Sequence, residues 1–267
     1  MGKTSRHLIF LKKFVLVLSV KNLSKSFSIG GNQSFKALDN IDLTLENESF
    51  NILIGGNGSG KSTLLNLIAG TIFPETGDIL IGGKSIVKKP DYNRAAVIAR
   101  IFQDPGAGTA PDLTVLENFR MAALRKKSKG LRLGLGKAFQ DEVAERLSSL
   151  SMGLEKKLYT QAYQLSGGQR QAMALLMATF DPPEILLLDE PTAALDPKSA
   201  TKIMQLADQI IREKSITALL VTHHMKEAVD YGDRLIQLHH GRIRRDLDRG
   251  EKSVLKPSEI MEWFYEE

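Results

Sequence analysis

The sequence predicts an α/β fold with a mainly parallel sheet, and three observations support this class. Short apolar runs alternate with segments of helical periodicity over much of the chain, as expected of parallel strands joined by helices. A glycine-rich turn follows the apolar run at 51–54 and precedes a helical segment, which is the order of a β–α unit. The run at 185–188 is apolar throughout, as in a central strand covered on both faces.

The composition is that of a globular protein. The 267 residues are 42% hydrophobic and 25% charged, with a formal net charge of +5, so the chain has enough apolar surface for a core. The length suits one large domain or two small ones. The absence of cysteine excludes disulfides, thiolate metal sites and a cysteine nucleophile, and it fits a reducing compartment.

No segment predicts a membrane-spanning helix. The best candidate, residues 8–20, is interrupted by Lys12 and Lys13 and falls short of the roughly 20 apolar residues that a span requires. It also lacks the long apolar core and cleavage site of a secretory signal. We therefore expect a soluble chain that is neither secreted nor membrane-spanning. Residues 1–14 are predicted to be a basic N-terminal extension, with a membrane-surface anchor as the alternative.

The first third of the chain is predicted to be rich in strands. Alternating or continuous apolar residues indicate strands at 15–20, 41–45, 51–54, 77–83 and 96–102. The segment 62–69 has helical periodicity and stops at Gly70, a residue type that commonly ends helices.

The middle of the chain changes to helical periodicity. Helices are predicted at 114–127, 137–150 and 167–180. A basic, glycine-containing loop at 128–136 separates the first two, and no proline- or serine-rich linker sets the segment apart. We therefore expect one domain over residues 15–267, with a helical subdomain inserted at about 104–165.

Strands and helices alternate again in the last third. The predicted order is a strand at 185–188, a helix at 197–212, a strand at 216–221 and a helix at 225–231. A turn at His240 and Gly241 joins two further strands, at 234–239 and 242–245, and a helix over 257–265 closes the chain.

The glycine-rich turn matches the phosphate-binding pattern G-x-x-x-x-G-K-[ST]. Glycine permits the tight curl that points backbone N–H groups inward, and the helix N-terminus adds partial positive charge. In this pattern Lys61 reaches the β- and γ-phosphates, and the Ser62 hydroxyl ligates Mg²⁺. The predicted ATP-binding residues are Gly55, Gly56, Asn57, Gly58, Ser59, Gly60, Lys61, Ser62 and Thr63. A triphosphatase and a kinase are both compatible with this motif alone.

Two adjacent carboxylates follow the apolar run at 185–188. Ligands of open α/β sheets bind at the carboxyl ends of the strands, so Asp189 and Glu190 are expected beside the nucleotide. We expect Asp189 to hold Mg²⁺ through a water and Glu190 to accept a proton from the attacking water. This use of the pair favours hydrolysis over phosphoryl transfer to a second substrate.

A third motif, Leu165-Ser166-Gly167-Gly168-Gln169, opens the predicted helix at 167–180. It resembles the signature motif of ATP-binding cassette (ABC) proteins. A serine hydroxyl and glycine N–H groups at a helix N-terminus form a second anion site, and one phosphate chain cannot occupy two distant sites of one protomer. The resemblance implies a head-to-tail homodimer. In it Ser166, Gly167, Gly168 and Gln169 bind the ATP that lies in the partner's P-loop.

Further residues stand at the positions of other ABC motifs. Gln103 matches the Q-loop glutamine, and the resemblance implies that it approaches Mg²⁺ and the attacking water, as a catalytic and metal-binding residue. Asp196 matches the D-loop, which crosses the dimer interface. His223 matches the switch histidine near the γ-phosphate. His224 stands where many relatives carry an acidic residue, so either histidine could be the switch residue. The register after the strand favours His223.

An aromatic residue is expected to stack on adenine. Phe27 stands where the family usually places this aromatic residue, and phenylalanine can serve because stacking requires only a π face. Phe35 is the competing candidate.

The resemblance extends from about residue 17 to residue 245. It implies a P-loop NTPase (RecA-like) core with an N-terminal antiparallel β subdomain and an inserted α-helical subdomain. It also implies an ATP-hydrolysing subunit that needs Mg²⁺ and drives a separate integral permease at the cytoplasmic face of the cell membrane. Segments 103–109 and 166–179 are similar to ATPase subunits of a bacterial importer group linked to aromatic amino acids. Such importers also use an extracytoplasmic substrate-binding protein.

Two alternatives remain at this point: a soluble ABC ATPase that acts on nucleic acid or the ribosome, and the motor of a separate-subunit exporter. The chain has one cassette and no long coiled-coil insertion, unlike ribosomal and DNA-repair relatives. Basic clusters occur at 125–132 and 242–249, but aromatic residues are only 6% and do not interleave with them. We therefore expect no nucleic-acid partner.

Overall fold

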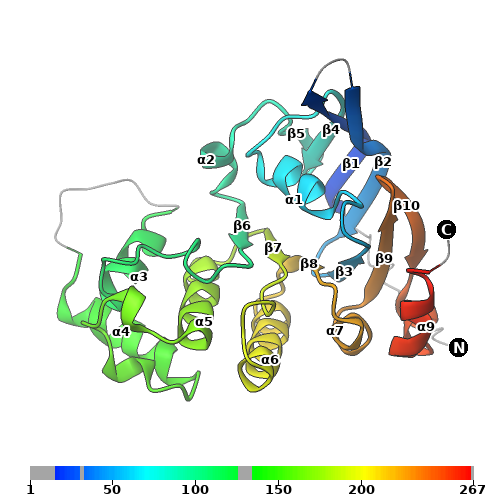
Figure 1. The fold of residues 1–267 in the computed structure, drawn as a ribbon. Helices are drawn as coiled ribbons and strands as arrows, with labels where there is room; N and C mark the ends of the chain where they lie inside the picture. Colours follow the sequence, from blue (N-terminus) through cyan, green and yellow to red (C-terminus); the bar gives the residue numbers. More distant parts are fainter. Residues whose placement is uncertain (1–15, 31–32, 126–133, 266–267) are drawn as a thin grey trace, which may run out of the picture.

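The computed structural model describes residues 16–30, 33–125 and 134–265. The predicted extension at 1–14, and residues 128–133 of the predicted basic loop, lie outside the described residues. The described chain forms two sheets and a group of helices (Figure 1).

Six strands form the larger sheet, in the order β10-β9-β3-β8-β7-β6. Their bounds are β3 Phe50–Ile54, β6 Ile98–Ile101, β7 Ile185–Asp189, β8 Thr217–Val221, β9 Arg234–His239 and β10 Arg242–Leu247. All neighbouring pairs are parallel except β9 and β10, which are antiparallel. The carboxyl ends of five strands therefore share one edge of this sheet.

The smaller sheet is antiparallel and has the order β2-β1-β4-β5. Its strands are β1 Leu16–Gly30, β2 Gln33–Glu46, β4 Thr76–Ile81 and β5 Lys84–Ser85. β1 and β2 extend well beyond the strands predicted at 15–20 and 41–45. The outer halves of these two strands are too polar to show an apolar alternation. They are stabilised instead by pairing with each other, although register shifts interrupt the pairing.

The first helix, α1 Lys61–Ala69, lies between the two sheets. Leu64, Leu65, Leu67 and Ile68 are fully buried. They join a core cluster that includes apolar residues of β1 and β2 and one face of the larger sheet. Because α1 begins where the glycine-rich loop ends, this packing anchors the loop from its helical side.

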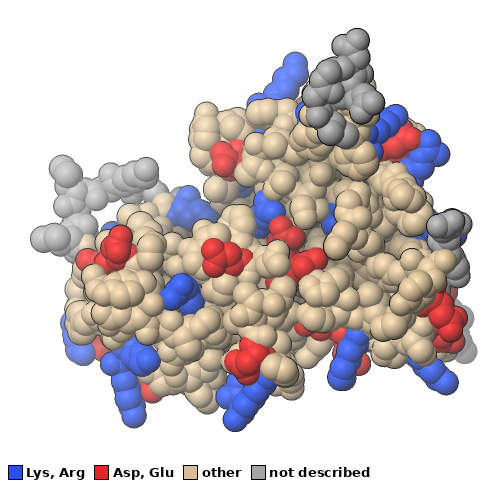
Figure 2. Space-filling view, in the orientation of Figure 1, with Lys and Arg blue, Asp and Glu red and all other residues tan. Residues whose placement is uncertain are grey.

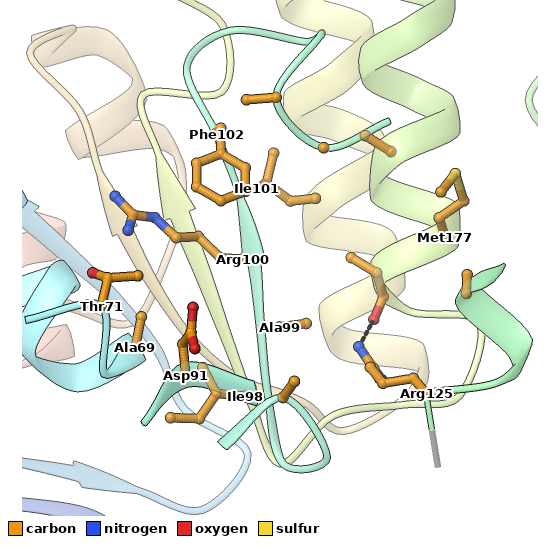
Figure 3. A pocket seen from close by; sticks show the side chains of 16 residues that line it. Ala69, Thr71, Asp91, Ile98, Ala99, Arg100, Ile101, Phe102, Arg125 and Met177 are labelled. Atoms are coloured by element: carbon orange, nitrogen blue, oxygen red, sulfur yellow. Dashed lines mark hydrogen bonds between the residues drawn. The ribbon is translucent and has the colours of Figure 1, made fainter. Parts of the chain in front are cut away.

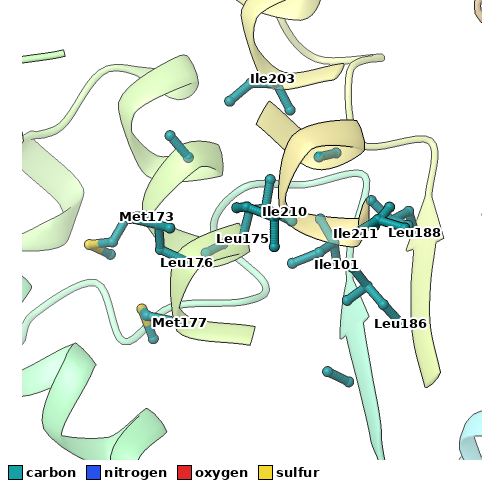
Figure 4. Packing of buried hydrophobic residues seen from close by; sticks show 14 of the residues in the cluster. Ile101, Met173, Leu175, Leu176, Met177, Leu186, Leu188, Ile203, Ile210 and Ile211 are labelled. Atoms are coloured by element: carbon teal, nitrogen blue, oxygen red, sulfur yellow. The ribbon is translucent and has the colours of Figure 1, made fainter. Parts of the chain in front are cut away.

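The opposite face of the larger sheet is covered by α5 Gly167–Ala178 and α6 Pro197–Glu213. Figure 4 shows Leu175 of α5 and Ile210 of α6 facing each other beside Ile101 of β6 and Leu186 of β7. The helices α3 Val115–Ala123 and α4 Lys137–Ser148 pack against α5. The short 3₁₀ turns η1 Leu154–Lys156 and η2 Ala162–Gln164 lead back to α5.

Four short helices complete the described chain. They are α2 Asp91–Arg94, α7 Met225–Asp230, α8 Arg249–Ser253 and α9 Pro257–Glu262. Within the described ranges, no helix is both long and apolar enough to cross a lipid bilayer. The predicted α/β core, the antiparallel β subdomain and the group of helices in the middle of the chain are confirmed.

Candidate functional site

The predicted nucleotide site lies where strands of the larger sheet end. The glycine-rich loop follows β3, Gln103 follows β6, and His223 follows β8. Asp189 is the last residue of β7, and Glu190 comes next. Because these four strands are parallel, their carboxyl ends bring segments that are far apart in sequence to a single edge.

The loop before α1 needs glycine at two of its positions. Gly58 and Gly60 have φ values of 77° and 104°, in the left-handed region that side chains other than glycine rarely adopt. A Cβ atom added at Gly60 would lie 2.4 Å from the backbone oxygen of Ala37 in β2, and one at Gly55 would lie 2.3 Å from the backbone oxygen of Leu238 in β9. The loop therefore packs tightly against both sheets.

Replacing Gly60 with Ala is expected to destabilise the fold by about 1–3 kcal/mol, because a left-handed alanine is strained and its methyl group meets a backbone oxygen. Urea unfolding of the variant and the parent chain measures this difference. Gly56→Ala is the matched control, since a Cβ there meets nothing within 4 Å. Equal unfolding midpoints for both variants would contradict the close approach.

Lys61 points back into the loop. Its Nζ donates hydrogen bonds to the backbone oxygens of Gly55, at 2.8 Å, and Gly56, at 3.0 Å. Burial lowers the pKa of Lys61, while the negative charges of Glu190 and Asp189 act in the opposite direction. An additional anion in this loop would favour the charged ammonium further. The Ser59 hydroxyl is buried with no hydrogen-bond partner in the described chain, so the loop also contains an unsatisfied polar atom.

Asp189 is paired with an arginine that the sequence analysis did not single out. An Nη of Arg100 in β6 lies 2.6 Å from Oδ2 of Asp189, and the other Nη lies 2.6 Å from Oδ1 of Asn66 in α1. The sequence does contain a signal for Arg100, because it is the one charged residue in the apolar run at 96–102.

Glu190 and His223 are in contact. Nδ1 of His223 lies 2.8 Å from Oε2 of Glu190, and an Nδ1–H tautomer would donate to this carboxylate oxygen. Glu190 has a φ of 45°, which is unusual for a residue with a side chain, and its backbone N–H donates to the Val221 oxygen of β8. His224 makes no such contact with Glu190; its ring lies against that of His223.

The loops after β7 and β8 are tied together by Glu227 of α7. Its two carboxylate oxygens accept hydrogen bonds from the hydroxyls of Thr192, at 2.7 Å, and Thr222, at 2.6 Å. Thr192 lies two residues after Glu190, and Thr222 directly precedes His223. Glu227 therefore helps to hold both members of the Glu190–His223 pair, a role that the sequence analysis missed.

Gln103 is exposed at the start of the loop after β6. The preceding residue is held by α5, because the amide of Gln171 donates to the Phe102 backbone oxygen at 3.1 Å. Gln171 is buried, so the loop that carries Gln103 and the helix that follows the signature motif are connected directly.

The signature residues form the N-terminus of α5. The Ser166 hydroxyl accepts from the backbone N–H of Gln169, and the Gln169 side chain accepts from the backbone N–H of Ser166, which is a capping box. Ser166 and Gly167 are exposed, whereas Gly168 is buried against Ser199 of α6. α5 and α1 cover opposite faces of the larger sheet, so the structure does not bring the signature residues to this chain's own glycine-rich loop.

Asp196 caps α6 beside the signature residues. Its Oδ1 accepts from the backbone N–H groups of Lys198 and Ser199. Hydrogen bonds from Ser199 hold the pKa of Asp196 below its ordinary value. The carboxylate is therefore the N-cap of α6, at the end of the loop that follows β7.

Phe27 and Phe35 are direct cross-strand partners in the hairpin of β1 and β2. Both rings are about half exposed. Two residues further along β2, the backbone of Ala37 meets the glycine-rich loop. The hairpin therefore presents a pair of aromatic rings near the loop, where the sequence suggested two competing single rings.

A groove of about 380 Å³ lies between β6, the end of α1 and the helices α3 and α5. Figure 3 shows it, with Arg100 and Phe102 close together and Met177 and Arg125 on the helical side. Much of its wall consists of small residues, namely Ala69, Ala95, Ala99, Ala107, Gly108, Ala122, Ala174 and Ala178. Phe73, Tyr92 and Met121, which stand close in sequence to wall residues, are exposed apolar side chains.

Basic and acidic side chains are interspersed on the face drawn in Figure 2. They do not gather there into one extended basic surface of the kind that tracks a phosphate backbone.

A parallel sheet with a P-loop after one strand and adjacent carboxylates after another defines a P-loop nucleoside triphosphatase. Comparison with known proteins narrows the class. The model of the family described as ABC transporter matches residues 38–193. The chain belongs to this family, it is an ATPase subunit of the ABC type, and the resemblance inferred from the signature motif is confirmed.

Similar proteins are ATP-binding subunits. A tyrosine transport ATP-binding protein of Clostridioides difficile is 42% identical, over 93% of this chain and 98% of its own length. A putative hemin import ATP-binding protein of Staphylococcus haemolyticus is 34% identical, over 85% of this chain and 99% of its own. A dimeric ATP-binding cassette in a post-hydrolysis state, bound to ADP and Pi, superposes with a TM-score of 0.75 at 31% identity. That match covers 87% of this chain and 98% of the cassette.

Proposed function

We propose that this ATPase powers the import of a small solute through a separate membrane permease. The observation that carries the hydrolytic part of the proposal is the convergence of a P-loop lysine, two carboxylates and a histidine at one sheet edge. The import part is supported by the similarity to transport and import ATP-binding proteins. A nucleotide-binding edge that also holds a carboxylate–histidine pair is suited to hydrolysis rather than to nucleotide binding alone.

The catalytic roles follow from the contacts. The inward N–H groups of the loop at 55–63 and the Lys61 ammonium bind and neutralise the phosphates. Glu190 accepts the proton of the attacking water. His223 contacts that carboxylate through Nδ1, and Nε2 would donate to a γ-phosphate oxygen when both ring nitrogens carry protons. Gln103 lies at the mouth of the same edge and helps to orient the water.

The residues present suit Mg²⁺, which prefers oxygen ligands and usually keeps several waters. The donor set consists of the exposed Ser62 hydroxyl, the Asp189 carboxylate, acting through a water, and the Gln103 amide oxygen. When bound, the ion neutralises charge on the β- and γ-phosphates. Among the described residues, no group of three or more His, Asp or Glu side chains could hold a metal ion.

Adenine stacks on the aromatic pair of the β1–β2 hairpin, with Phe27 as the first ring and Phe35 beside it. Stacking of this kind requires only an exposed π face, and both rings offer one.

The working unit is a head-to-tail homodimer. In one chain the signature residues and the P-loop are on helices at opposite faces of the sheet, so the exposed N-terminus of α5 serves the nucleotide of a second chain. Asp196, in the loop that packs against this N-terminus, belongs to the same interface. The dimeric state of a similar cassette bound to ADP and Pi supports a dimer of this chain.

The permease docks in the groove between β6 and the helices α3 and α5. The small wall residues leave room for a helix of the partner, and apolar side chains at the margin offer contact area. Gln103 follows β6 directly, so a partner in the groove would sense movement of this loop. The subunit would then be a peripheral protein at the cytoplasmic face of the membrane, and an extracytoplasmic protein would deliver the solute to the permease.

An aromatic amino acid is the substrate we propose. The support is the 42% identity with a tyrosine transport ATP-binding protein, together with the similarity of segments 103–109 and 166–179 to importers of this kind. The cassette itself does not contact the solute, so specificity resides in the permease and the binding protein.

The test is reconstitution of the cassette with its co-purifying integral membrane protein in lipid vesicles. We expect ATP hydrolysis to rise several-fold with the membrane partner and a loaded binding protein, with ATP-dependent uptake of labelled tyrosine or tryptophan. In the groove variant Ala122→Glu, hydrolysis by the isolated cassette should persist while uptake is lost, because a buried carboxylate would oppose docking.

Ala138→Glu, at an exposed position of α4, is the matched control and should transport normally. Stimulation of hydrolysis by DNA or RNA instead of the membrane partner would favour the nucleic-acid alternative. ATP-dependent transport of the solute away from the side on which the cassette binds would identify an exporter.

A further inference from the structure

Arg100 is a charged side chain in an otherwise apolar position. It lies on β6 between Ala99 and Ile101, both buried, and its own side chain is only 12% exposed. A buried guanidinium is costly unless its donors are paired. Its surroundings should therefore explain why an arginine stands there.

The guanidinium bridges two elements of the nucleotide site. One Nη donates to Oδ1 of Asn66 in the helix that follows the P-loop, and the other donates to Oδ2 of Asp189 at the end of β7. Both distances are 2.6 Å. Its Nε is buried without a partner in the described chain, so the two Nη bonds account for how the group is held.

The bridge also reaches the groove. Arg100 and Phe102 both line it, and the guanidinium carbon lies 4.9 Å from the centre of the Phe102 ring (Figure 3). The ring limits the positions that the guanidinium can adopt on that side. Arg100 is thus fixed by α1, by β7 and by the residue that precedes Gln103.

We propose that Arg100 is a positioning residue for Asp189 and thereby sets how strongly Mg²⁺ and ATP bind together. The inference rests on the proposed role of Asp189 toward Mg²⁺. The bond to Arg100 occupies Oδ2 and fixes the plane of the carboxylate relative to α1, while the carboxylate keeps its second oxygen for a metal-bound water. Hydrogen bonds that orient a ligating carboxylate are an ordinary means of tuning a metal site.

A purely electrostatic role would act in the opposite direction. A guanidinium near a divalent cation repels it, so loss of the charge alone would strengthen metal binding. A positioning role predicts weaker binding when the bridge is broken, even where the positive charge is kept. Arg100→Gln removes both the charge and the fork, whereas Arg100→Lys keeps the charge and loses the two-point contact.

The experiment measures the coupling between metal and nucleotide without turnover. The affinity of the full chain for a non-hydrolysable ATP analogue is determined in EDTA and in saturating Mg²⁺, and the ratio is the coupling factor. We expect the affinity in EDTA to be unchanged and the coupling factor to fall about tenfold in Arg100→Gln, with a smaller fall in Arg100→Lys. Asn66→Ala removes the other anchor and should lower the factor in the same direction.

Arg125→Gln is the matched control. Arg125 lines the same groove and donates to the backbone oxygen of Ala178, so its loss should leave the coupling factor unchanged. An unchanged or increased factor in both Arg100 variants and in Asn66→Ala would overturn the positioning role. Absence of any Mg²⁺ effect in the parent chain would instead overturn the proposed metal site itself, so the two failures are distinguishable.

Discussion

Replacing Glu190 with Gln is expected to lower the rate of ATP hydrolysis by about 10²–10⁴-fold, the range typical of a lost general base, while ATP still binds. Glutamine keeps the size and one oxygen of the side chain, so the partner at His223 and the P-loop remain. It cannot accept the proton of the attacking water. ATP should therefore stay bound, and the homodimer that it closes should accumulate.

Two measurements test this expectation together. Phosphate release reports turnover, and size-exclusion chromatography with light scattering reports an ATP-dependent dimer. Glu184→Gln, upstream of β7 and outside the site, is the matched control and should keep normal turnover. Wild-type rates in Glu190→Gln would remove Glu190 from the catalytic role and leave the base unidentified.

The second large effect is expected for Ser166→Arg. The exposed N-terminus of α5 would carry a bulky cation in place of a small hydroxyl, so it could no longer close over the partner's nucleotide. We expect hydrolysis to fall by at least about 100-fold, since catalysis here depends on positioning. The affinity of the single chain for ATP should not change, because α5 and α1 lie on opposite faces of the sheet.

Lost hydrolysis with unchanged ATP affinity would indicate a site that is completed by a second chain rather than within the same chain. ATP affinity is measured by equilibrium binding, and dimerisation is measured in a double variant that also carries Glu190→Gln. Loss of the Ser166 cap costs about 1 kcal/mol of stability, so Ser148→Arg on α4 is a suitable substitution control. If ATP affinity of the isolated chain fell together with turnover, the signature residues would act within their own protomer.

The motifs and the central strands could be predicted because each is a local pattern. The apolar run at 185–188 is buried on both faces in β7, and the glycine-rich turn lies between β3 and α1 as its spacing indicates. The outer halves of β1 and β2 could not be predicted, since their stability comes from pairing with each other rather than from apolar alternation.

The choice between His223 and His224 shows a similar division. The sequence offers two adjacent histidines after β8 and favours His223 by register alone, and the structure adds the contact between Nδ1 of His223 and Glu190. Phe27 and Phe35 are 8 residues apart in the chain, yet the hairpin makes them neighbours. In both cases the deciding contact joins residues from different strands or loops.

The sequence by itself determined the α/β class and the family and predicted the positions of the P-loop, signature and carboxylate residues, because these are encoded in short runs with a characteristic order. Only the tertiary structure decided which side chains support them. Arg100 reaches Asp189 across 89 positions, and Glu227 joins Thr192 across 35. Arg100 stands out in the sequence as a charge within an apolar run, but no local pattern shows which residue it contacts. These side chains become neighbours only through the tertiary fold, in which parallel strands end at the same edge of the sheet.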